Sequence, residues 1–156
     1  MLDKQQDGRK KPNFNKEQVT NMASTAAVTD QYKQDILNGV HQPGDTYMCA
    51  LYNPGSLSKS TTAYTSSGET SGSGYIAGGV ALTGYTVSIS GDTAYITWAN
   101  PSWTSSSITA SAALIYNASR SNKAICVLTF SSTTSTAGTF TLSLPAAGAS
   151  STVTIS

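Results

Sequence analysis

The chain has 156 residues, 11% of them charged, and a formal net charge of +1, which suits one weakly charged domain with a small appendage. Residues 46–156 carry only five charged side chains: Lys59, Glu69, Asp92, Arg120 and Lys123. A nucleic-acid-binding protein needs clustered Lys and Arg, and a membrane span needs about 20 apolar residues in a row, so we expect neither nucleic acid nor membrane as a partner. Ser and Thr solvate such a surface, which suits a protein packed against neighbours or one exposed outside the cell.

Residues 1–28 are predicted to form an N-terminal arm. Residues 1–13 are almost all polar, lack the apolar stretch of a signal peptide, and would be disordered on their own. A small basic cluster, Arg9, Lys10 and Lys11, is either part of a solvated tail or a contact to a partner on which the arm becomes ordered.

A short helix is predicted within this arm. Asn15 can cap it, Phe14 can pack onto Val19, and a weak apolar stripe continues to Ala26. A helix of this length is marginal alone, so we expect it to pack on this chain's sheet or on a neighbour's.

Residues 29–45 predict a second short helix followed by a linker. Thr29 can be the N-cap of this helix, and Gly39 can end it. Its expected apolar face consists of Tyr32, Ile36 and Leu37.

From Thr46 onward the hydrophobic period changes to two, which predicts a β domain over residues 46–156. Eight strands are expected, near residues 46–53, 80–83, 85–90, 93–98, 109–116, 123–131, 139–144 and 152–155. The fold class is therefore mainly β: an antiparallel β-sandwich or jelly-roll-like domain, preceded by an extended N-terminal arm and one or two short helices.

The strongest local signal is a hairpin over residues 85–98. Gly91 and Asp92 form its two-residue turn, because Gly can take the positive φ that the first position of a type II′ turn requires. This turn sets the register, with Ser90 opposite Thr93 and Val87 opposite Ile96. One face is then apolar and the other carries mostly hydroxyl groups. The apolar face consists of Tyr85, Val87, Ile89, Ala94, Ile96 and Trp98.

Two segments are irregular. Residues 64–79 contain five glycines and form a long connection, and such connections are often functional or ordered by contact. Trp103 follows the turn at Asn100 and Pro101, and it either covers the end of the core or anchors an interface.

The sequence lacks the residues that catalysis or metal binding requires. His41 is the only histidine, with no carboxylate cluster beside it, so we expect no metal, no cofactor and no enzymatic activity. No Gly-x-Ser-x-Gly motif is present to position a nucleophile. Cys49 and Cys126 both lie in predicted strands, and we interpret them as buried thiols, with a disulfide as the alternative.

Several blocks of residues 32–156 resemble a widespread group of small structural proteins from tailed bacteriophage particles. Among them are Leu37-Asn38-Gly39-Val40-His41, Ala50-Leu51-Tyr52, Ser71-Gly72-Ser73-Gly74-Tyr75, Pro101-Ser102-Trp103, Ala113-Leu114-Ile115-Tyr116-Asn117 and Gly138-Thr139-Phe140-Thr141-Leu142. The resemblance does not extend to the arm before residue 30, and it does not separate head, neck and tail proteins.

The resemblance implies a virion structural protein, assembled in the bacterial cytoplasm. The first hypothesis is a capsid decoration or cement protein that binds the major capsid protein across capsomer junctions, as a dimer or trimer. The alternatives are a neck or tail subunit that contacts portal, neck or tail proteins, and a carbohydrate- or host-binding fibre module with an exposed platform of Tyr75, Tyr95 or Trp103. The candidate partner contacts are residues 64–79 and Arg9, Lys10, Lys11, Phe14, Tyr75 and Trp103.

Overall fold

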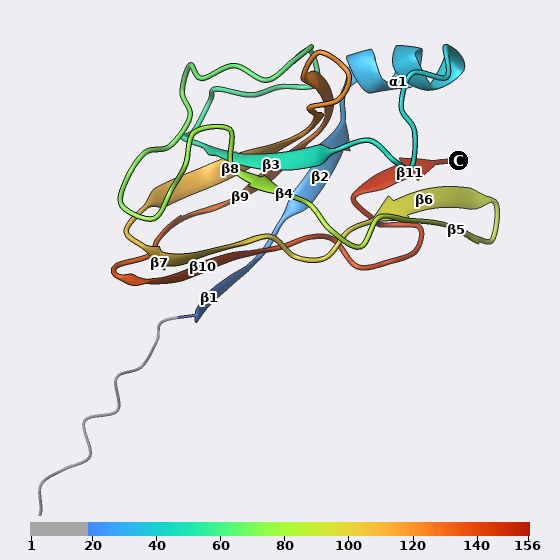
Figure 1. Ribbon diagram of the computed structural model, residues 1–156. Coiled ribbons are helices and arrows are strands. Elements are labelled where there is room, and N and C mark those ends of the chain that lie inside the picture. Colours follow the sequence, from blue (N-terminus) through green and yellow to red (C-terminus); the bar gives the residue numbers. More distant parts are fainter. Residues whose placement is uncertain (1–18) are drawn as a thin grey trace, which may run out of the picture.

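The computed structural model describes residues 19–156, with side chains from residue 24 onward, and shows a mainly β protein with one short helix (Figure 1). The elements are β1 (Val19–Ala23), β2 (Thr25–Val28), α1 (Asp30–Leu37), β3 (Tyr47–Tyr52), β4 (Val80–Ala81), β5 (Thr86–Ser90), β6 (Thr93–Thr97), β7 (Ser102–Ser106), β8 (Thr109–Asn117), β9 (Lys123–Thr134), β10 (Gly138–Ser143) and β11 (Val153–Ile155). The predicted fold class is confirmed.

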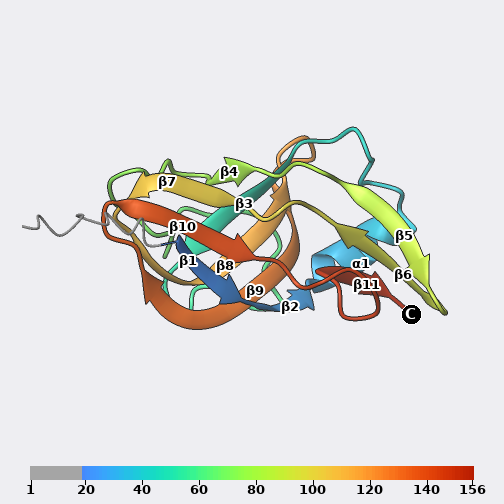
Figure 2. The same ribbon diagram turned by 90° about the horizontal axis from the view of Figure 1, so that it is seen from below.

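The strands form two layers. One layer is a five-stranded sheet in the order β2-β9-β8-β3-β4. Two three-stranded sheets, β1-β10-β7 and β11-β6-β5, lie side by side to form the other layer (Figures 1 and 2). Neighbouring strands are antiparallel except β1 and β10, which run parallel.

The main core fills the space between the layers. Leu51 of β3, Leu128 of β9 and Phe140 of β10 are fully buried in it. Each such side chain stabilises the fold by about 1.5–3 kcal/mol relative to an exposed position. Cys49 and Cys126 are unpaired and fully buried here, as interpreted from the sequence, and burial raises the pKa of the Cys49 thiol to about 12.

A second core covers the outer face of the five-stranded sheet. Buried side chains such as Tyr52 and Leu114 point outward there and pack against Leu57 and Tyr64 of the long connection between β3 and β4. The connection approaches the sheet closely at Gly79, where a Cβ atom would lie 1.8 Å from the backbone oxygen of Cys49. The glycine-rich segment therefore covers this chain's own sheet, which explains why β8 and β9 are apolar on both faces.

The β5–β6 hairpin has the predicted register. All five expected pairs from Thr86–Thr97 to Ser90–Thr93 are present, and Gly91 has a φ of +59° at the turn. Tyr85 and Trp98, both assigned to the apolar face, are in contact just beyond the ladder, with ring centroids 5.8 Å apart.

Helix α1 begins where the sequence predicts. The Thr29 side chain accepts a hydrogen bond from the backbone N–H of Tyr32, and Gly39 follows the helix with a φ of +62°. Thr29 also donates to the backbone oxygen of Ala124 in β9, which fixes the helix to the five-stranded sheet. The predicted apolar face is correct for Tyr32 and Ile36, but Leu37 is 89% exposed.

The first predicted helix is wrong in its described part, and one strand was missed. Residues 19–28 form β1 and β2, because β1 pairs with β10 and β2 pairs with β9 in the two layers. These pairings satisfy backbone groups that a marginal helix would have satisfied within itself. The predicted start of that helix, at Phe14 and Asn15, lies outside the described residues. The missed strand is β7, where the Ser- and Thr-rich sequence after Pro101 gave no clear alternation.

Candidate binding surface

An apolar face on the β11–β6–β5 sheet is partly exposed. Strand alternation places Val87 and Ile89 of β5, Ile96 of β6 and Ile155 of β11 on this face, and the pairs Val87–Ile96 and Ala94–Ile155 join the three strands. Five large hydrophobic residues are exposed in the described part of the chain. Four of them lie on or beside this face: Leu37, Val87, Ile89 and Ile155.

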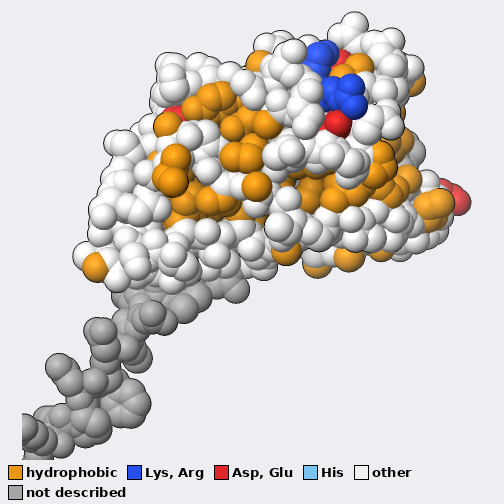
Figure 3. Space-filling view, in the orientation of Figure 1, with side chains coloured by type: hydrophobic (Ala, Val, Ile, Leu, Met, Phe, Trp, Pro, Cys, Tyr) orange, Lys and Arg blue, Asp and Glu red, His pale blue; other side chains and the backbone are white. Residues whose placement is uncertain are grey.

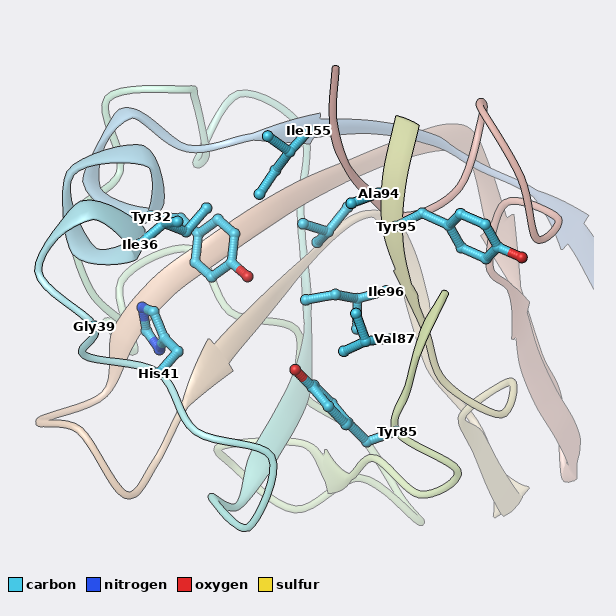
Figure 4. A pocket seen from close by; sticks show the side chains of 11 residues that line it. Tyr32, Ile36, Gly39, His41, Tyr85, Val87, Ala94, Tyr95, Ile96 and Ile155 are labelled. Carbon is cyan, nitrogen blue, oxygen red and sulfur yellow. The ribbon is translucent and has the colours of Figure 1, made fainter. Parts of the chain in front are cut away.

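Helix α1 covers one end of this face and leaves a groove of about 200 Å³ beside it. Tyr32 and Ile36 of the helix and His41 of the following loop form one wall, and the sheet forms the other (Figure 4). The hydroxyl groups of Tyr32 and Tyr85 point into the groove, whereas the Tyr95 ring points away from it (Figure 4).

The far end of the face has no cover among the described residues. Val87, Ile89 and Ile155 are 56%, 75% and 50% exposed. Figure 3 shows a band of hydrophobic side chains that crosses this side of the molecule and continues between α1 and the hairpin. Contiguous apolar surface of this kind is typical of a site where another protein docks.

Beneath α1, a buried cluster of polar groups connects the helix to the turn between β8 and β9. Asp35 is 2% exposed and accepts hydrogen bonds from Lys123 Nζ at 2.6 Å and from Gln31 Nε2 at 3.0 Å. His41 Nε2 lies 3.4 Å from the other Asp35 oxygen, and Asn117 Nδ2 donates to His41 Nδ1 at 2.9 Å. Both ring nitrogens therefore face this cluster, and only the ring carbons remain for the groove.

A second carboxylate extends the cluster. Asp45 accepts two hydrogen bonds from the Arg120 guanidinium, both at 2.9 Å, one from Asn117 at 2.8 Å and one from the backbone of Gln42 at 3.0 Å. A bidentate pair of this kind fixes both side chains in one geometry. The loop between α1 and β3 is thereby fastened to the β8–β9 turn.

The ionisation of the cluster follows from these contacts. Burial lowers the pKa of His41, and the opposing effect of Asp35 does not offset it, so His41 is neutral near pH 7. Burial alone would raise the pKa of Asp35, but the hydrogen bonds from Lys123 and Gln31 outweigh it and the pKa is lowered. The hydrogen bonds from Arg120 are the main reason that the pKa of Asp45 is far below its usual range.

A third buried acceptor is Glu69, in the connection between β3 and β4. Its carboxylate accepts hydrogen bonds from the hydroxyls of Tyr64 and Tyr75, at 2.7 and 2.6 Å, and from the backbone of Gly78 at 2.7 Å. Glu69, Arg120 and Lys123 thus each bind groups of this chain, although the Arg120 and Lys123 side chains stay 41% and 32% exposed. Of the five charged side chains in residues 46–156, Lys59 and Asp92 remain fully on the surface.

The structure places Tyr75 and Trp103 together, with Trp103 buried and Tyr75 half-buried. Their rings stack at 6.2 Å, Trp103 is 3% exposed, and the Tyr75 hydroxyl is held by Glu69 and the backbone of Leu51. Trp103 therefore packs in the core, the first of its two interpretations, whereas Tyr75 as a partner contact stays a prediction. Tyr95, the third residue named for an aromatic platform, lies on β6 in another sheet from Trp103.

The remaining predicted contacts, Arg9, Lys10, Lys11 and Phe14, lie outside the described residues. The surface that the sequence did not predict is the one formed by Val87, Ile89 and Ile155, since alternation assigned Val87 and Ile89 to an apolar face expected to be buried. The lengths of the two elements could have indicated this exposure. The predicted hairpin is longer than the face that the eight-residue helix α1 can cover.

The described residues hold no group of three or more His, Cys, Asp or Glu side chains placed to bind a metal, and no helix long and apolar enough to cross a membrane. Comparison of the chain with protein-family models finds no match, and comparisons with curated proteins and with solved structures find none either. Its function is therefore inferred from its residues and their geometry.

Proposed function

We propose that this chain is a structural protein of tailed-phage particles that acts by binding alone. Its place is the outside of the capsid, where it decorates the head and braces capsomer junctions through contacts with the major capsid protein and with copies of itself. The resemblance of residues 32–156 to small phage structural proteins supports the class of protein, and the surface chemistry supports the mode of action.

The observation that carries this proposal is the scarcity of unpaired charge on the β domain. Glu69, Arg120 and Lys123 each bind a group of the same chain while staying partly exposed, and the exposed pair Asp30 and Lys33 neutralise each other at 3.1 Å. In the view of Figure 3, the Lys and Arg atoms gather in one small cluster beside acidic atoms, acidic atoms appear at two further places, and the remaining surface is uncharged or hydrophobic. In a soluble domain about a quarter of all residues are usually charged, and these charges keep a free monomer in solution. A surface that neighbouring subunits cover does not need them.

In a capsid, many repeated contacts compensate for the weakness of each single one. Each decoration subunit needs only a modest interface, because repetition around the shell raises the effective concentration of every further contact. The exposed aliphatic residues of the hairpin and the hydroxyl-rich sheet faces provide such an interface without a deep pocket.

The experiment is to measure the copy number of the chain in purified particles by quantitative mass spectrometry, with the major capsid protein as internal reference. Hundreds of copies per particle are expected for a decoration protein. Tens of copies or fewer would contradict a place on the capsid surface and favour the neck or tail alternative. Absence from the particle would overturn the assignment as a virion protein. Glycan binding by the isolated chain would instead favour a fibre module.

A further inference from the structure

The groove beside α1 presents an unpaired hydrogen-bond donor as well as apolar walls. Tyr32 is 4% exposed, its hydroxyl points into the groove (Figure 4), and no described residue hydrogen-bonds to that hydroxyl. The hydroxyl is reached by solvent through the groove, so it can donate to an acceptor that an occupant brings. An extended peptide segment brings both apolar side chains and backbone carbonyl acceptors.

We propose that this groove binds the N-terminal segment of a second copy of the chain, with Phe14 seated against Val87 and Ile155 and a backbone carbonyl accepting from Tyr32. The contact is head to tail, because each copy supplies one segment and one groove. The inference concerns only copies of this chain and does not depend on the proposed place in the virion.

Chain length excludes the groove of the same copy for Phe14. The segment 19–28, which forms β1 and β2, runs in roughly one direction from the far end of the molecule toward α1 (Figures 1 and 2), and Val28 at its end lines a pocket together with Ile155. Ten residues in β conformation span about 30 Å. Phe14 precedes Val19 by five positions, which reach at most about 18 Å when fully extended. A Phe14 that enters a groove therefore enters that of a neighbour.

The composition of the segment fits the groove. Phe14 is the only aromatic residue in positions 1–18, and an aromatic ring buries about 150–250 Å² when it is enclosed. Such a ring would cover the exposed aliphatic side chains that α1 does not reach.

Charge adds a second match. Arg9, Lys10 and Lys11 precede Phe14 by three to five positions, and Asp92, at the exposed hairpin tip, is the only charged residue between positions 70 and 119. With Phe14 in the groove, the basic cluster lies within reach of this carboxylate. Exposed pairs of this kind are screened by salt, so the association should weaken as ionic strength rises.

The test is sedimentation equilibrium of the purified full-length chain over a wide concentration range. The wild type is expected to self-associate into rings or open chains, as a head-to-tail contact requires. Phe14→Ala removes the ring, and Val87→Lys places a charge on the groove; each change should weaken association at least tenfold. Because Val87 is 56% exposed, the Val87→Lys variant should still fold, which near-ultraviolet circular dichroism verifies. Ile76→Lys is the matched control, at an exposed aliphatic residue in another part of the fold.

Mixing the two variants gives the decisive measurement. Phe14→Ala keeps an intact groove and Val87→Lys keeps an intact segment, so together they should form a one-to-one pair that grows no further. A wild-type chain that remains monomeric at all concentrations would overturn the proposal. Two other results would also overturn it: association of Phe14→Ala equal to wild type, as in a symmetric contact through the exposed face, or equal loss of association in Ile76→Lys. The copy number per particle is independent of each of these outcomes.

Discussion

Glu69 shows how a single charged side chain can order a long connection. It accepts from two tyrosine hydroxyls and one backbone N–H, so the segment around Tyr64, Tyr75 and Gly78 converges on one carboxylate. Tyr64 in turn stacks on Tyr116 of the sheet below, with ring centroids 4.8 Å apart. The connection is therefore fixed on the outer face of the sheet by directional bonds as well as by packing.

Replacement of this carboxylate should destabilise the fold. Glu69→Gln keeps the shape but replaces one acceptor oxygen with a donor, and we expect a loss of about 2 kcal/mol in the free energy of unfolding. Urea unfolding at pH 7 measures it. Asp92→Asn, a similar change at the exposed hairpin tip, should stay within about 0.5 kcal/mol of wild type. Equal effects of the two changes would show that the Glu69 contacts contribute nothing to stability.

At the scale of elements, α1 and its following loop are held by the β8–β9 turn more than by their own propensity. The helix has eight residues, too few to be stable alone. Lys123 and Arg120 of the turn reach Asp35 and Asp45 on either side of His41. Because α1 forms one wall of the groove, this polar cluster also fixes the shape of the binding surface.

The cluster makes the stability depend on pH. The folded chain holds His41 with a lowered pKa, so the unfolded chain binds more protons as the pH falls below about 6.5, and stability is lost in that direction. Asp35 and Asp45 also have lowered pKa values, so a second loss is expected as the pH falls below about 4. Urea midpoints measured from pH 8 to pH 3 should show both stages.

A His41→Gln variant separates the two stages. It should remove the dependence between pH 7 and pH 5 while the loss below pH 4 remains. If the variant retains the full slope between pH 7 and pH 5, the titrating group is not His41.

At the scale of the whole molecule, the two layers are joined by the start of the described chain. β1 pairs with β10 in one layer, and β2 pairs with β9 in the other, with Ser24 between them. Ser24 donates to the backbone oxygen of Ser143 at 2.7 Å, which closes the crossing point. Residues 19–28, the described part of the predicted arm, thus belong to both layers.

Two truncations distinguish an appended segment from an integral one. Removal of residues 1–18 leaves every described pairing in place, so the free energy of unfolding should change by less than about 1 kcal/mol. Removal of residues 1–28 deletes β1 and β2, and nine paired positions with them, so we expect a loss of about 4 kcal/mol or more. Thermal unfolding followed by circular dichroism compares the two. Similar midpoints for both forms would show that β1 and β2 are dispensable.

The sequence by itself determined the local structure wherever a pattern and a turn agreed. Gly91 set the register of the hairpin, Thr29 and Gly39 bounded the helix, and the alternation in Phe140 and Leu142 marked a strand, because each depends on neighbours close in the chain. Eight of the strands followed from this kind of signal.

Only the tertiary structure decided what each face meets. Residues 19–28 became strands because partners more than 95 positions away satisfy their backbone, and residues 64–79 became a cover because the sheet beneath them is apolar on both sides. Val87 and Ile89 stayed exposed because α1 is too short to reach the hairpin tip. Alternation reports that a side chain is on the apolar face of a strand, but the burial of that face depends on long-range packing that no local pattern contains.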